Sequence, residues 1–216
     1  PGYHGNIASL ADVCSECPVN EYKEVSGVAP CDTCLAIRPH TNTNNLTARA
    51  LESDCVCGPG YGWFDDVQDA VTGAPLCQEC PVDTYKDISV TMACYSCTAH
   101  SETNSLTGRD NVTDCLCDPA YAGTDTDGLF AGTLVTPLHT CEECPIDTYK
   151  DTLGTDACAA CTTHSTTNSL TGRTFVTSCL CDPGYHSDVM TIVESRVFYT
   201  GALLDSPTAT CRACGQ

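Results

Sequence analysis

The fold is decided by residues 141–185, which read CEECPIDTYKDTLGTDACAACTTHSTTNSLTGRTFVTSCLCDPGY. This stretch holds six cysteines, arranged as two Cys-x-x-Cys pairs and one Cys-x-Cys pair, and it ends in a Pro-Gly-Tyr turn. The same order of cysteines begins at Cys14 and at Cys77, and a fourth copy begins at Cys211. Successive copies start 63, 64 and 70 residues apart. The chain is therefore a tandem repeat in which each copy is one structural module.

The composition is that of a disulfide scaffold. Of 216 residues 20 are cysteine, whereas there are only four Phe, one Trp and two Met to fill an apolar core. Cross-links must then hold each small module together. An even number of regularly spaced cysteines indicates an oxidising location, which is extracellular or at the cell surface. We expect a small disulfide-rich fold of mostly short β-strands and loops, with the modules in an elongated linear array.

Charge and motifs exclude several function classes. The net charge is −19 with only nine Lys and Arg, which argues against binding nucleic acid or anionic lipid. No stretch is long and apolar enough to insert into a membrane. There is no nucleophile elbow, phosphate-binding loop, metalloprotease motif or catalytic pair of carboxylates, so we expect that the chain is not an enzyme.

The spacing of the cysteines sets the expected module limits. The segment after each Pro-Gly-Tyr turn varies most in length, as exposed loops do, and its third copy, Thr191 to Leu204, is rich in Val, Ile, Phe and Tyr and predicts a hairpin. We expect residues 1–13 to be the C-terminal loop of a preceding module, 14–76, 77–140 and 141–210 to be modules 1, 2 and 3, and 211–216 to start a fourth module.

A family resemblance rests on these same residues. Cys-x-x-Cys-Pro-x-x-Thr-Tyr-Lys, a second Cys-x-x-Cys, His-Ser-x-Thr and Cys-x-Cys-x-Pro-Gly-Tyr together resemble the cysteine-rich module of ephrin receptors, which is related to EGF-like and tumour-necrosis-factor-receptor-like modules. Module 3 is the closest match, and module 1 departs most, with Glu21 for Thr and Ala48 for Gly. The resemblance implies a fold and a compartment, and it carries no function of its own.

The resemblance also implies a disulfide pairing. The main rival is an EGF-style crossing, with Cys17–Cys34 and Cys31–Cys55. Either pairing leaves Cys14 and Cys214 unpaired or bonded between chains, as expected of a longer tandem array or of a head-to-tail polymer. The implied pairs are Cys17–Cys31, Cys34–Cys55, Cys57–Cys77, Cys80–Cys94, Cys97–Cys115, Cys117–Cys141, Cys144–Cys158, Cys161–Cys179 and Cys181–Cys211.

Other recurrent residues have competing interpretations. Two Cys-x-x-Cys pairs could form a zinc ribbon, but this would leave the Cys-x-Cys pairs unexplained. The recurrent histidines are expected to pack or to cap turns, and the recurrent arginines to cover apolar surface or to pair with carboxylates. These residues are His40, His100 and His164, and Arg49, Arg109 and Arg173.

Two kinds of surface site remain as predictions. Asn45-Leu-Thr and Asn111-Val-Thr are N-glycosylation sequons, so glycans are expected partners. Asp125 and Asp127 open a sequence like a calcium loop, but the further ligands that such a loop needs are missing. They are weak calcium candidates, and we predict no cofactor.

Taken together, near-identical modules, sequons and the lack of catalytic motifs favour an extracellular structural repeat protein. It would be a subunit or segment of a cell-surface coat, appendage or glycosylated filament, and it would associate with itself or continue into further modules. The alternative is a ligand-binding or spacer ectodomain of a receptor or adhesion protein, with the variable loop at Thr191 to Leu204 as the contact surface.

Overall fold

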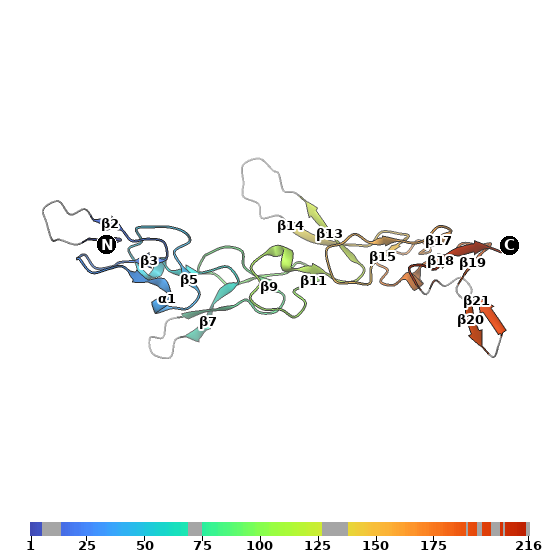
Figure 1. Cartoon of the computed structure of the whole chain (residues 1–216), viewed down its shortest axis with the longest axis horizontal. Coiled ribbons are helices and arrows are strands. Elements are labelled where there is room, and N and C mark those ends of the chain that lie inside the picture. Colours follow the sequence, from blue (N-terminus) through green and yellow to red (C-terminus); the bar gives the residue numbers. More distant parts are fainter. Residues whose placement is uncertain are drawn as a thin grey trace. The chain divides into compact units, whose positions relative to one another are not determined.

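The computed structural model describes residues 1–5, 14–68, 75–126, 138–188, 190–193, 196–199, 204 and 206–214. This part of the chain consists of antiparallel strand pairs and a few helical turns (Figure 1). Nine disulfides cross-link it. The predicted class, a small disulfide-rich fold of short strands and loops, is confirmed.

Three kinds of strand pair recur along the chain, all of them two-stranded. The first kind joins the Pro-Gly-Tyr turn to the next Cys-x-x-Cys, and it comprises β1 (Tyr3–His4) with β2 (Ser15–Glu16), β7 (Tyr61–Gln68) with β8 (Pro75–Glu79), β13 (Tyr121–Thr126) with β14 (Leu138–Glu143), and β19 (Tyr185–Ser187) with β22 (Cys211–Ala213). The second kind comprises β3 (Glu21–Tyr22) with β4 (Asp32–Thr33), β9 (Thr84–Tyr85) with β10 (Tyr95–Ser96), and β15 (Thr148–Tyr149) with β16 (Ala159–Ala160). The third comprises β5 (Thr41–Asn42) with β6 (Val56–Cys57), β11 (Ser101–Glu102) with β12 (Leu116–Cys117), and β17 (Ser165–Thr166) with β18 (Leu180–Cys181).

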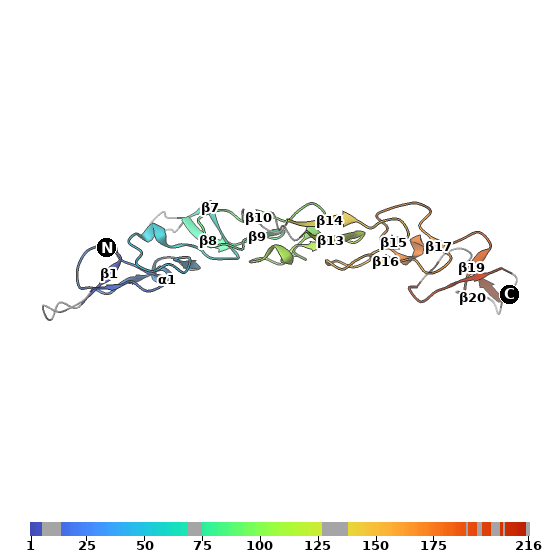
Figure 2. The ribbon, with the colours of Figure 1, turned by 90° about the horizontal axis from the view of Figure 1, so that it is seen from above.

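The strands of β7–β8 and β13–β14 are the longest, and the partners of each pair lie side by side in both views (Figures 1 and 2). They occupy the segment whose length varies between copies. The hairpin predicted in the third copy is present as β20 (Met190–Val193) paired antiparallel with β21 (Arg196–Tyr199). The helical turns are α1 (Cys34–Ile37) and the 3-10 turns η1 (Glu52–Asp54), η2 (Val112–Asp114) and η3 (Val176–Ser178).

Cysteines form most of the buried hydrophobic interior of the described residues. Cys17, Cys34, Cys57, Cys80 and Cys117 have no exposed surface. In modules 1 and 3 the tyrosine of the Tyr-Lys dipeptide joins a cysteine cluster: Tyr22 clusters with the Cys34–Cys55 disulfide, and Tyr149 with Cys179 and Leu204. Disulfides and a few rings or aliphatic side chains therefore take the place of a large apolar core, as the shortage of large side chains predicts.

The chain divides into two compact units. Residues 1–97 and 103–115 form the first, and residues 98–102 and 116–216 form the second. The division falls inside the predicted module 2, so the module limits drawn from the cysteine spacing remain a proposal. Each unit contains one complete junction between successive modules, one around Cys57–Cys77 and the other around Cys117–Cys141.

Candidate functional site

The disulfides show how each module is closed and how it is joined to the next. The structure joins the same nine pairs that the resemblance implies, and the rival EGF-style crossing is not formed. Because Cys57–Cys77 and Cys117–Cys141 cross the proposed module limits, they link neighbours covalently. Within the described part of the chain Cys14 and Cys214 are exposed free thiols. A zinc ribbon would need four free thiolates in each copy, so this geometry does not support it.

The junction in the first unit is built on the turn Pro59-Gly60-Tyr61. The Gly60 N–H donates to the Lys86 carbonyl at 2.8 Å, and the Gly60 carbonyl accepts from the Cys80 N–H at 2.8 Å. Gly60 has a φ of 75°, which favours glycine. At Gly62 a Cβ would lie 2.7 Å from the Cys94 sulfur, so only glycine lets β7 pass so close to the next module's disulfide.

A buried lysine holds this junction. The Lys86 side chain is completely buried, and its ammonium donates to the carbonyls of Cys57 at 3.0 Å, Tyr61 at 2.8 Å and Val90 at 2.6 Å. Cys57 and Tyr61 belong to module 1, whereas Val90 and the lysine belong to module 2. A single ammonium group therefore binds carbonyls on both sides of the junction. Burial lowers the pKa of Lys86 from 10.5 to about 8 because the charged form loses its hydration.

The second unit repeats this arrangement with a small change. Lys150 is buried and donates to the carbonyls of Tyr121, at 2.7 Å, and Gly154. The carbonyl of Cys117, which corresponds to the Cys57 acceptor, is instead taken by the Gly154 N–H at 2.9 Å. Burial lowers the pKa of Lys150 as well. In module 1 the equivalent Lys23 is buried and donates to Gly27 and Ala29 in its own loop.

Sequence reasoning noted the Tyr-Lys dipeptide but assigned the lysine no role. A signal was available, because the chain has only three lysines and all three lie at the same position of the repeat. In an acidic protein a surface lysine can stand almost anywhere, so strict placement indicates a structural requirement. All three being buried also means that no lysine ammonium contributes to the surface charge.

The recurrent histidines stack on the tyrosines of the turns after the Cys-x-Cys pairs, which read Pro-Gly-Tyr in modules 1 and 3 and Pro-Ala-Tyr in module 2. The ring centroids lie 3.9 to 4.1 Å apart and the planes are nearly parallel in the pairs His40–Tyr61, His100–Tyr121 and His164–Tyr185. Each histidine adopts a φ of 61° to 62° and accepts a backbone hydrogen bond from the residue after the Cys-x-Cys pair. The histidines therefore shape the turn and pack on it.

A mutual pair of hydrogen bonds closes the other end of each module. In module 2 the Asp83 N–H donates to Thr103 Oγ1 at 2.9 Å, and the Thr103 N–H donates to Asp83 Oδ1 at 3.0 Å. The same exchange joins Asn20 to Thr43 and Asp147 to Thr167. These threonines are only 1% exposed, so each clasp is an interior feature rather than a ligand site.

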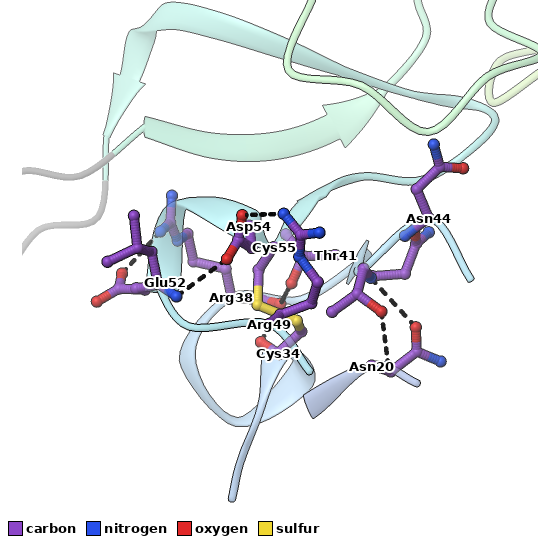
Figure 3. Close-up of a disulfide and its surroundings, with 12 residues drawn as sticks. Asn20, Cys34, Arg38, Thr41, Asn44, Arg49, Glu52, Asp54 and Cys55 are labelled. Atoms are coloured by element: carbon purple, nitrogen blue, oxygen red, sulfur yellow. Dashed lines mark hydrogen bonds and ion pairs between the residues drawn. A yellow bond between two sulfur atoms is a disulfide. The ribbon is translucent and has the colours of Figure 1, made fainter. Parts of the chain in front are cut away.

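The recurrent arginines behave differently from one module to the next. Arg49 Nη2 lies 2.6 Å from Asp54 Oδ1, and this hydrogen bond lowers the pKa of Asp54 (Figure 3). Arg109 pairs with Asp114 in the same way. Arg173 has no ion pair with any described residue, and its buried Nε has no acceptor there. Pairing with a carboxylate is thus seen for two of the three arginines.

The predicted surface sites are only partly covered by the structure. Asn45 and Asn111 are both exposed, and Asn111 Oδ1 accepts hydrogen bonds from the N–H and the hydroxyl of Thr113. Asp125 lies in β13 opposite His139, which is strand rather than calcium loop, and Asp127 lies outside the described residues. Among the residues whose positions are described, no group of three His, Cys, Asp or Glu side chains could hold a metal ion.

Comparison with known proteins shows what the repeat is similar to. Residues 132–179 match the family model described as tyrosine-protein kinase ephrin type A/B receptor-like. Cysteine repeat modular protein A of Toxoplasma gondii is 29% identical over 82% of this chain. Signal peptide, CUB and EGF-like domain-containing protein 2 of Danio rerio is 27% identical over 73% of the chain. The matched segments make up 5% and 14% of these relatives' own lengths.

The chain is thus an extracellular, disulfide-rich repeat protein whose repeats are similar to ephrin-receptor-like and EGF-like modules. Its relatives are named for cysteine-repeat, CUB and EGF-like modules rather than for an enzymatic activity. In the described segments, no helix has the length and apolar character needed to cross a membrane. The residues that recur in every copy are used to join and shape modules, and this makes the junction the candidate functional site.

Proposed function

We propose that this chain is a structural segment of an extracellular coat, appendage or filament, and that its junctions keep successive modules attached under mechanical load. The observation that carries the proposal is the junction itself. In both units a disulfide, a strand pair and a buried lysine bridge the same boundary. Such a junction opposes both separation and rotation of the neighbouring modules.

The use of the recurrent side chains supports a structural rather than a catalytic role. The lysines are buried against carbonyls, the histidines stack on tyrosines, and the threonines of the clasps are inaccessible. A catalytic group needs access to substrate and a partner that activates it. We propose that the chain is not an enzyme because its repeated polar groups already serve internal contacts.

Glycans and other modules are the proposed partners. Asn45 and Asn111 are both exposed, so the side-chain amides of both sequons are accessible, and we propose that both carry N-glycans. Because the interior is small, sugars on the surface would shield it from proteases. Self-association, or continuation into further modules of the same kind, completes the proposal.

Electron microscopy of the native material, combined with gels run with and without reductant, tests this proposal. We expect fibres or a coat in which glycan density decorates successive modules. Collapse of a ladder to one short species on reduction would indicate a disulfide-linked polymer, whereas one long species under both conditions would indicate a longer array. A monodisperse monomer that captures a soluble partner would overturn the structural role in favour of a receptor or adhesion ectodomain.

A further inference from the structure

Modules 1 and 2 each seat a carboxylate on the recurrent arginine. In module 1, Asp54 Oδ1 accepts from Arg49 Nη2 at 2.6 Å, while its Oδ2 accepts from the N–H groups of Ala50 and Leu51 at 3.1 and 3.0 Å (Figure 3). In module 2, Asp114 bonds Arg109 and accepts from the Asn111 N–H at 3.2 Å. The repeat therefore builds a receptor for one carboxylate and fills it from its own chain.

Module 3 builds the same receptor and leaves it unfilled. The aspartate position is occupied by Ser178, which has no carboxylate. The frame is nevertheless retained: Arg173 still bridges Tyr149, its carbonyl accepts from the Lys150 N–H at 3.0 Å, and the Ser178 N–H still bonds the Phe175 carbonyl at 2.9 Å. The guanidinium of Arg173 has no ion pair with any described residue, whereas those of Arg49 and Arg109 each have one. Its buried Nε lacks an acceptor among these residues, as the Nε of Arg109 also does.

The surroundings of this arginine differ from those of its counterparts. Phe175, two residues after Arg173, is 60% exposed, at the position where module 1 has Leu51 and module 2 has the sequon residue Asn111. Residues 174–177 read Thr-Phe-Val-Thr, so no N-glycan can attach there. Among the described residues at this position of the repeat, module 3 alone combines a guanidinium without an ion pair and an exposed aromatic ring, and arginine and aromatic residues are both enriched at protein interfaces.

We propose that Arg173 and Phe175 form a docking site for an aspartate or glutamate side chain of a partner protein, with an apolar group of the partner packed on the Phe175 ring. The carboxylate of the partner would bind Arg173 as Asp54 binds Arg49 and Asp114 binds Arg109 within their own modules. A sulfated or phosphorylated polymer is disfavoured, because the chain carries a net charge of −19 and would repel a polyanion. A single carboxylate forms the charge-assisted hydrogen bonds to Arg173 and brings only one negative charge close to this acidic chain.

NMR titration of the whole chain with a blocked dipeptide, N-acetyl-Leu-Asp-amide, tests this proposal. We expect the Nε–Hε signal of Arg173 and the Phe175 amide to shift saturably, while the signal of Arg109 stays in place because Asp114 occupies that site. The matching Leu-Asn dipeptide, which lacks the charge, should have no effect. The variant S178D restores the internal carboxylate and should weaken binding at least about tenfold.

A reciprocal variant in module 2 keeps the test valid if S178D does not fold. D114S empties the module 2 site and should make Arg109 respond to the Leu-Asp dipeptide. The proposal is overturned if no signal saturates, if S178D binds the dipeptide as well as the wild type does, or if Arg173 and Arg109 respond equally in the wild type. Tighter binding of inorganic sulfate than of the dipeptide would also overturn it, since the site would then select sulfated groups.

Discussion

Replacing Lys86 with methionine should loosen the first junction, whereas the equivalent change in module 1 acts within its own loop. Methionine keeps the length and most of the volume of the side chain but donates no hydrogen bond. The carbonyls of Cys57 and Tyr61 therefore lose this donor, while the Val90 carbonyl keeps the Met92 N–H at 3.0 Å. Each carbonyl left unsatisfied costs about 1–3 kcal/mol. Relief of the buried charge offsets part of this sum, so we expect a net loss of about 2–4 kcal/mol.

Native-state hydrogen exchange measures this loss where it arises. The amides of Gly60 and Cys80 bond across the junction, and their protection should fall in K86M, whereas the Ala120 amide at the other junction should be unaffected. Lys23→Met is the matched control, because that lysine bonds two carbonyls of its own loop and should cost about 2 kcal/mol. A change below about 1 kcal/mol at Gly60 in K86M, or an equal loss of Gly60 protection in Lys23→Met, would refute the clamp.

Three further predictions follow from the same contacts. Burial lowers the pKa of Lys86 to about 8, so the unfolded chain binds this proton more tightly than the folded chain does. The free energy of unfolding of the wild type relative to K86M should therefore rise between about pH 8 and 10.5 and stay level below pH 8, which urea unfolding at several pH values can check. His100→Ala and His100→Gly both lose the stack on Tyr121, but only glycine relieves the strain of the left-handed backbone at this position. The melting temperature of His100→Ala should therefore be lower than that of His100→Gly, and the reverse order would contradict this account of the turn. Mass spectrometry of non-reduced peptides should find Cys57 linked to Cys77 and Cys117 linked to Cys141, and a crossed pairing within one module would disprove the covalent link between neighbours.

The covalent frame could be predicted because it depends on order along the chain. The repeated order of cysteines, with the Pro-Gly-Tyr turn after each Cys-x-Cys, indicates a module, a compartment and a fold class without any long-range information. Short strands follow, since two cysteines separated by a turn must return to within about 6 Å of each other. The hairpin of β20 and β21 was predictable for a similar local reason, from its β-branched and aromatic residues.

The roles of the polar residues depended on contacts between segments far apart in the sequence. Lys86 is a clamp only because the carbonyls of Cys57 and Tyr61, 29 and 25 residues away, converge on its ammonium. The missing partner of Arg173, by contrast, could be read from the sequence, because Ser178 stands where Asp54 follows Arg49.

By itself, then, the sequence determined the repeat, its oxidising surroundings and its small strand-rich class, since these follow from residue order and composition. Only the tertiary structure decided which side chains are buried and which carbonyls and charges they meet. The physical reason is that burial and pairing are set by the atoms that folding brings together, and a repeat pattern records the position of a residue without recording its neighbours in space.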